Sequence, residues 1–227
     1  MRTLTKEMQQ NLTAKKAIDL LKEGNKRFVV NLKVNRNLLQ QMNETSEGQF
    51  PFAFILSCID SRTSAELIFD QGLGDIFSCR IAGNILNTDI LGSMEFACKM
   101  AGSKVIVVLG HTRCGAVKGA CDDARLGNLT SLLEKLKPAV EAETITRDNR
   151  NSSNSAFVER VADINVHLTM QQITRRSNVL REMIEAGEIA IIGGMYDVET
   201  GVVEFYEDSM ISSEAIYQSA ETKPVVE

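Results

Sequence analysis

The chain has 227 residues and an apolar content of 44%, which is enough to bury a sizeable hydrophobic core. With a formal net charge of −5 and 5% aromatic residues, it lacks the basic surface of a nucleic-acid-binding protein, so we expect no nucleic-acid partner. No apolar run is long enough to span a membrane and residues 1–10 hold no signal core, so we expect a cytoplasmic protein without a membrane partner.

The first part of the chain is predicted to be helical. Between residues 12 and 30 the apolar side chains recur at the spacing of a narrow stripe on one helix face, at Ala14, Ala17, Ile18, Leu21 and Phe28. Such a helix needs a surface to pack against. We therefore interpret residues 1–48 as an N-terminal helical arm and residues 49–227 as an α/β core, within a single domain that spans residues 1–227.

Two short apolar runs without alternation, residues 52–57 and 104–110, predict strands that are buried on both faces of a parallel sheet. Between them lie a predicted strand at 76–80 and a predicted helix at 87–101. Parallel pairing through crossover connections is therefore expected, with the carboxyl ends of the strands at one edge of the sheet.

The second half of the chain continues the α/β pattern. Residues 202–206 follow a Gly-rich stretch and predict the last strand of a hairpin, antiparallel at the sheet edge. The other predicted elements are a helix at 114–125, a polar loop at 144–155, a helix at 165–185 that stops at Gly187, and a strand at 189–192. The predicted fold is α/β, with a central, mostly parallel sheet, helices on both faces and an antiparallel edge strand.

Potential metal ligands follow both buried strands. Cys58 comes directly after the first strand and His111 directly after the second, so the two should lie side by side at the sheet edge where α/β proteins bind ligands. We expect His111 to begin the next helix, so that His111 and Cys114 share a helix face. Two thiolates and one imidazole leave a tetrahedral zinc ion one free position, which is typical of a catalytic site.

Both motifs resemble those of the β-class carbonic anhydrases. Residues 58–62, Cys-Ile-Asp-Ser-Arg, match a Cys-x-Asp-Ser-Arg motif, and residues 110–115 match a Gly-His-x-x-Cys-Gly motif. The resemblance extends over nearly all of the chain. It implies one Zn²⁺ per subunit bound by Cys58, His111 and Cys114, with Asp60 and Arg62 as a catalytic pair beside the metal.

The resemblance also implies the reaction, which is reversible hydration of CO2 to bicarbonate and a proton by attack of a zinc-bound hydroxide. Asp60 would accept a hydrogen bond from the hydroxide, and a bidentate pair with Arg62 would keep Asp60 ionised. In some family members the aspartate itself binds zinc, so Asp60 is a metal ligand only if the site is closed. Ile55 replaces the tryptophan of the bicarbonate-inhibited branch, which favours the open form.

Five further residues correspond to the family's substrate pocket and assembly. Gln49 matches a glutamine that donates its amide to substrate, and Phe96 matches a tyrosine supplied by a second subunit, without its hydroxyl. Phe77, Ala82 and Gly83 fall where pocket residues lie. By the same resemblance the N-terminal helix packs across a neighbouring subunit, so the minimal unit would be a homodimer, with assembly into tetramers left open.

Other interpretations stay open at this point. Asp60 and Arg62 could be a surface ion pair, Gln49 an ordinary loop residue, and the apolar pocket residues part of the core or an interface. We interpret His167 as structural. The five cysteines are an odd number, which fits free or metal-bound thiols rather than disulfides. Three of them are expected to be packing residues, namely Cys79, Cys98 and Cys121, of which Cys121 is the reserve ligand.

Two alternative functions also remain open. Some relatives with the same zinc fold hydrolyse carbon disulfide or carbonyl sulfide, and the zinc ligands cannot separate those substrates from CO2. The chain could instead be a non-catalytic, zinc-binding oligomerisation module. The intact Asp60 and Arg62 argue against the module, because a structural metal needs neither residue.

Overall fold

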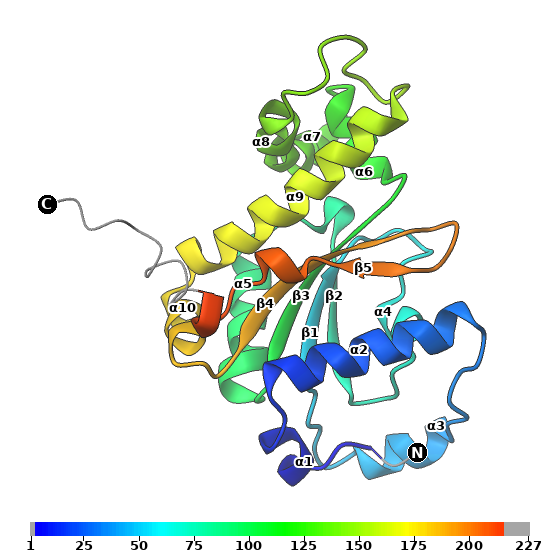
Figure 1. Ribbon diagram of the computed structural model, residues 1–227, viewed down its shortest axis with the longest axis vertical. Coiled ribbons are helices and arrows are strands. Elements are labelled where there is room, and N and C mark those ends of the chain that lie inside the picture. The colour runs from blue at the N-terminus through cyan, green and yellow to red at the C-terminus, as the bar shows by residue number, and fades with distance from the viewer. Residues whose placement is uncertain (1–2, 216–227) are drawn as a thin grey trace, which may run out of the picture.

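The computed structural model describes residues 3–215, and its centre is a five-stranded sheet in the order β2-β1-β3-β4-β5 (Figure 1). The strands are β1 (Ala53–Ser57), β2 (Ile76–Arg80), β3 (Val105–His111), β4 (Ala190–Tyr196) and β5 (Val203–Phe205). The pairs among β1 to β4 are parallel, whereas β5 runs antiparallel to β4 at the edge. The predicted α/β fold with an antiparallel edge strand is confirmed.

Helices connect and cover the strands. The α-helices are α1 (Lys6–Gln10), α2 (Ala14–Val29), α3 (Leu38–Glu44), α4 (Ala65–Ile68), α5 (Thr88–Glu95), α6 (Gly115–Cys121), α7 (Gly127–Leu133), α8 (Lys137–Ala142), α9 (Ser155–Arg176) and α10 (Asn178–Glu185). Short 3₁₀ segments are η1 (Ala82–Asn84), η3 (Glu134–Leu136) and η4 (Glu207–Ser209), and α5 continues into a π-helical segment, η2 (Phe96–Met100). Among residues 3–215, no helix has both the length and the apolar content needed to cross a membrane.

The single helix predicted at 165–185 is wrong, because the structure has two helices there. α9 begins at Ser155, and the chain breaks at Ser177, whose backbone is extended. The Ser177 hydroxyl accepts a hydrogen bond from the Leu180 N–H group in the first turn of α10, at 3.1 Å, and donates one to the Glu95 carboxylate, at 2.6 Å. Ser177 caps the start of a new helix, and the spacing of the apolar residues alone does not reveal this break.

Helices lie on both faces of the sheet, and alternate strand residues point to opposite faces. Leu56 and Ile106 pack with α5, α9 and α10 on one face. Ile55 and Val107 pack with α2 and α4 on the other face, so α2 and α5 lie on opposite sides in Figure 1. A third cluster, built from α6, α8 and the first half of α9, covers Cys58 at one end of the sheet.

The N-terminal arm packs against its own chain. Ala17, Ile18 and Leu21 of α2 are at most 5% exposed and belong to the core cluster on the α2 face of the sheet. The apolar stripe of α2 is thus covered by the sheet of the same chain, whereas Leu32, Leu39 and Met42 of the arm remain 51–71% exposed. Packing of the arm across a neighbouring subunit stays a prediction.

Asp70 connects the arm to the core. Its side chain is 3% exposed and accepts hydrogen bonds from Arg27 of α2 at 2.6 Å, from the Val34 N–H group at 3.2 Å and from the Arg36 guanidinium. Burial alone would raise the pKa of Asp70, but the hydrogen bonds from Arg27 and Arg36 outweigh it and hold that pKa below its usual value.

We expect Asp70→Asn to lower the free energy of unfolding by about 3 kcal/mol, because it leaves the Arg36 side chain, which is 8% exposed, and the partly exposed Arg27 without their charge partner. Asp123→Asn is the matched control, since Asp123 pairs with Arg125 and Lys137 at the surface, where solvent screens the ion pairs and their loss should cost far less. Because the folded-state pKa of Asp70 is lowered, the wild type alone should lose this contribution as the pH falls below about 4. Denaturant unfolding at pH 7 and at several pH values below about 4 measures both effects, and equal losses in the two variants at pH 7 would contradict the assignment.

Candidate metal centre

The parallel pairing of β1 and β3 brings the two sequence motifs to one edge of the sheet. Ser57 lies opposite Leu109 in the ladder, so Cys58 leaves β1 beside the end of β3. The expectation that His111 begins a helix is wrong, because His111 is the last residue of β3 and lies opposite Tyr196 of β4. Sheet pairing even continues past His111, where the Thr112 N–H group donates to the Tyr196 carbonyl at 2.9 Å.

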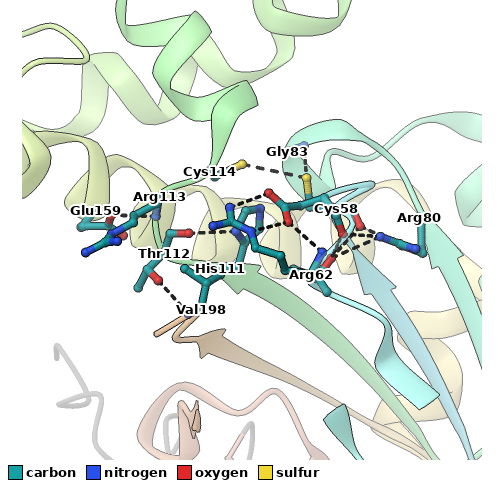
Figure 2. Close-up of polar contacts among 12 residues, drawn as sticks. Cys58, Arg62, Arg80, Gly83, His111, Thr112, Arg113, Cys114, Glu159 and Val198 are labelled. Atoms are coloured by element: carbon teal, nitrogen blue, oxygen red, sulfur yellow. Dashed lines mark hydrogen bonds and ion pairs between the residues drawn. The ribbon is translucent and has the colours of Figure 1, made fainter. Parts of the chain in front are cut away.

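Cys114 is the N-cap of α6 rather than a residue on a shared helix face. The chain turns between His111 and Cys114 at Arg113, whose φ of 57° lies in the left-handed region. In this conformation the Arg113 N–H group donates to the Glu159 carboxylate of α9 at 2.8 Å. The turn therefore places His111 and Cys114 side by side without a helix between them, as Figure 2 shows.

Cys58, His111 and Cys114 form a buried group of potential metal ligands. Their ligand atoms all lie within 4.8 Å of one another, and the three residues are 4%, 1% and 1% exposed. Among residues 3–215, this is the only group of three or more His, Cys, Asp or Glu side chains placed to hold one metal ion. The structure thus brings together all three predicted ligands.

The donor atoms fit a zinc ion. The two Sγ atoms are 4.0 Å apart, close to the roughly 3.8 Å expected when two sulfurs bind one tetrahedral zinc. His111 Nδ1 lies 2.9 Å from the Thr112 carbonyl, whereas its Nε2 atom is buried without a hydrogen-bond partner in the described chain. A buried ring nitrogen is seldom left unpaired, so the group is suited to a metal that takes this lone pair.

The electrostatics of the two thiols also favour a bound cation. A hydrogen bond from the Cys114 thiol lowers the pKa of Cys58, and the resulting Cys58 thiolate raises the pKa of Cys114. The Gly83 N–H group also donates to Cys58 Sγ, at 3.3 Å. Two thiolates this close repel each other, so the second ionises only when a cation lies between them.

Asp60 and Arg62 form a bidentate pair beside the cluster. Arg62 Nε donates to Asp60 Oδ1 at 2.9 Å, and its NH2 group donates to Oδ2 at 2.7 Å. The Arg62 backbone N–H group adds a third hydrogen bond at 3.0 Å. These hydrogen bonds hold the pKa of Asp60 well below its usual range. Asp60 is thus ionised and engaged by Arg62, and it is not one of the clustered ligands.

Two residues that the sequence analysis did not select as site residues fix the loop that carries Cys58 and Asp60. Arg80 Nε donates to the Cys58 carbonyl at 3.0 Å, and the other end of its guanidinium donates to the Asp60 carbonyl. The Thr63 hydroxyl lies 3.0 and 2.9 Å from the same two carbonyls. Arg80 could have been found, because the last residue of β2 must lie beside the last residue of β1 in a parallel pair.

The predicted substrate residues fall into separate places. Ala82 and Gly83 adjoin the metal group through the Gly83 hydrogen bond to Cys58. Phe77 and Phe96 contact each other, with ring centroids 6.2 Å apart, in a pocket of about 640 Å³ between β2 and α5. Gln49 is exposed near Gly74, at the amino ends of β1 and β2, so this chain does not bring it to the metal group.

The remaining histidine and cysteines lie outside the group. His167 stacks on Tyr206 with ring centroids 4.8 Å apart. Cys121, the reserve ligand, is not among the clustered atoms, and burial raises the pKa of its thiol to about 11. Cys79 and Cys98 are free thiols, and burial raises the pKa of each.

Comparisons with known proteins agree with this geometry. The carbonic anhydrase family profile matches residues 53–203. Carbonic anhydrase 2 of Mycobacterium tuberculosis is 37% identical over 187 residues, covering 80% of this chain and 87% of that protein. The carbonic anhydrase of Mycolicibacterium smegmatis is 35% identical over 190 residues, covering 81% and 89%. The β-carbonic anhydrase CafA of Aspergillus fumigatus matches with a TM-score of 0.67 and 26% identity, covering 92% of this chain and 98% of that one.

The mostly parallel sheet, the Cys-His-Cys group at its carboxyl edge and the sequence match therefore define a carbonic anhydrase of the lyase class. The chain belongs to the β-class carbonic anhydrases.

We expect Cys58→Ser and His111→Ala to abolish stoichiometric zinc binding, because each removes a donor from a three-ligand group. Cys121→Ser should retain about one zinc ion per chain, which makes it the matched thiol control. Zinc content by atomic emission and the thiolate charge-transfer absorption of Co²⁺-loaded protein measure the difference. Full zinc content in Cys58→Ser would refute this ligand set.

Proposed function

We propose that this protein catalyses the reversible hydration of CO2 to bicarbonate and a proton, with one zinc ion per subunit held by Cys58, His111 and Cys114. The observation that carries the proposal is the buried three-donor group with an ionised Asp60–Arg62 pair beside it. When bound, zinc lowers the pKa of a coordinated water molecule, so that a strong nucleophile forms near neutral pH. A purely structural zinc site would instead have four protein ligands.

The carboxylate of Asp60 has a defined task in this reaction. Because Arg62 holds the pKa of Asp60 far below neutral, the side chain can only accept hydrogen bonds at working pH. The carboxylate can therefore accept a hydrogen bond from the attacking water molecule, and this bond fixes the direction of the water's lone pair. Arg80 and Thr63 support this role by holding the backbone on both sides of Ile59.

We infer further that the substrate wall is completed across subunits. Ala82 and Gly83 lie beside Cys58, but Phe77 and Phe96 line a pocket that contains none of the metal ligands. Phe96 is 56% exposed, which suits a side chain that a second copy of the chain would cover. Gln49, at the other end of the sheet, can likewise reach a metal group only in a neighbouring subunit. A cytoplasmic location stays a prediction from the sequence alone.

We expect Arg62→Ala to keep its zinc but to lower kcat for CO2 hydration about 100-fold, because Asp60 loses the pair that orients it. Arg125→Ala is a closely matched control, since Arg125 also binds an aspartate two residues before it, at the surface. Stopped-flow hydration of CO2 with zinc content on the same samples separates the two effects. Unchanged hydration in Asp60→Asn would contradict the role given to Asp60, whereas a zinc-loaded wild type that does not hydrate CO2 would support a non-catalytic zinc module instead.

We also expect the protein to form at least a dimer in solution. Phe96 and Met100 are 56% and 76% exposed on the α5 side of β2, a large apolar area for a free surface. A chain from Sordaria macrospora, from structures of two tetrameric β-carbonic anhydrases, matches with a TM-score of 0.63 and 27% identity, covering 73% of this chain and 85% of that one. Sedimentation velocity should show dissociation in Phe96→Glu but not in Ile145→Glu, whose side chain is 77% exposed elsewhere. A monomeric wild type would contradict the proposal.

A further inference from the structure

A polar pocket lies on the α9 side of the sheet, away from the metal ligands. Its volume is about 460 Å³, and none of the residues that line it is acidic. Its wall comes from the start of α5, the η3–α8 segment and one face of α9. The lining residues are Ile85, Leu86, Asn87, Thr88, Lys135, Pro138, Asn165, Thr169, Gln172 and Arg176.

Two cations line this pocket without acidic partners. Neither Lys135 nor Arg176 forms an ion pair or a side-chain hydrogen bond among residues 3–215. By contrast, nearby Lys137 pairs with Asp123 at 3.3 Å. In a protein with a net charge of −5, two unpaired cations facing one pocket favour a negatively charged ligand locally.

The face of α9 supplies neutral donors to the same pocket. Asn165, Thr169, Gln172 and Arg176 recur at the spacing of a single helix face, where a helix packed on a core would carry apolar residues. Thr169 is 3% exposed as a residue, and its hydroxyl has no hydrogen-bond partner in the described chain. This hydroxyl is not among the fully buried unpaired atoms, so it is open to the pocket that Thr169 lines and can bind a polar ligand there.

The start of α5 also borders the pocket, and the Asp89 carboxylate in its first turn lies outside the pocket lining. Asn87 is the N-cap of this helix and accepts the Ile90 N–H group at 2.9 Å, while Thr88 lines the pocket. The first N–H groups of a helix have no partners within it, and the helix dipole favours an anion at this end. Two cations, a helix N-terminus and side-chain donors together match a dianion with several acceptor oxygens.

We propose that this pocket binds the phosphate group of a small molecule, with Arg176 and Lys135 as charge partners and Thr169 and Gln172 as hydrogen-bond donors. The site is separate from the metal centre but adjoins it through Gly83. Asn165 donates to the Gly83 carbonyl at 2.9 Å, and the Gly83 N–H group donates to Cys58 Sγ at 3.3 Å. The pocket is therefore two hydrogen bonds from a metal ligand.

The test is isothermal titration calorimetry of the zinc-loaded, full-length protein with inorganic phosphate and, separately, with glycerol 3-phosphate at constant ionic strength. We expect saturable binding that weakens about tenfold or more in Arg176→Gln, since a charge-assisted bidentate contact is lost. Arg175→Gln is the matched control, because it removes the same charge from the neighbouring position, which does not line the pocket. Thr169→Val, which keeps the side-chain volume, should also weaken binding, and thermal unfolding confirms that each variant is folded.

Each outcome decides the proposal. Tighter binding of the ester identifies a small phosphate ester as ligand, and tighter binding of inorganic phosphate identifies the free ion; both support the site. Equal weakening in Arg175→Gln and Arg176→Gln would show a general charge effect and overturn it. So would the absence of saturable binding, or binding that survives in Arg176→Gln and disappears when zinc is removed, which would place phosphate at the metal centre.

Discussion

The hydrogen-bonded pairing of β1 with β3 is the constraint on which the metal centre depends. Both strands are fully buried, and their register sets Ser57 opposite Leu109. Because the strands run in the same direction, the residues that follow them emerge at the same edge, and Cys58 and His111 meet there from positions far apart in the sequence. A shift of one residue in this register would exchange the two faces of β1 and move its apolar side chains away from their core clusters.

Hydrogen bonds then fix the backbone of the loop after β1, which carries Cys58 and Asp60. Arg80 and Thr63 occupy the carbonyl groups of Cys58 and Asp60, so the loop backbone is held from both sides. The Asp60 side chain is left to Arg62, with which it makes two charge-assisted hydrogen bonds of 2.9 and 2.7 Å. Arg80 thus fixes the loop backbone and Arg62 engages the Asp60 side chain, while the Nε2 atom of His111 has no hydrogen-bond partner among residues 3–215.

The apolar patterns predicted most of the sheet, because strands buried on both faces have few alternative structures. β2 has the predicted bounds of 76–80, and the three side chains predicted to bind metal from their place after the two buried strands do lie together. The local geometry of the turns was harder to predict from the sequence. The turn at Arg113 depends on hydrogen bonds to Glu159 and Tyr196, which are distant in sequence, so the spacing of His111 and Cys114 was misread as helical. The places of Phe77 and Gln49 likewise depend on tertiary structure, and their roles on a second subunit.

Helix α9 contacts both halves of the metal centre. Near its start Glu159 accepts the Arg113 N–H group of the loop that carries Cys114, and further along Asn165 donates to Gly83, which in turn contacts Cys58. The surroundings of both sulfur atoms are thereby connected by hydrogen bonds to one continuous helix, α9. A substitution that moved α9 would therefore disturb the surroundings of both sulfurs at once, even though neither cysteine belongs to that helix.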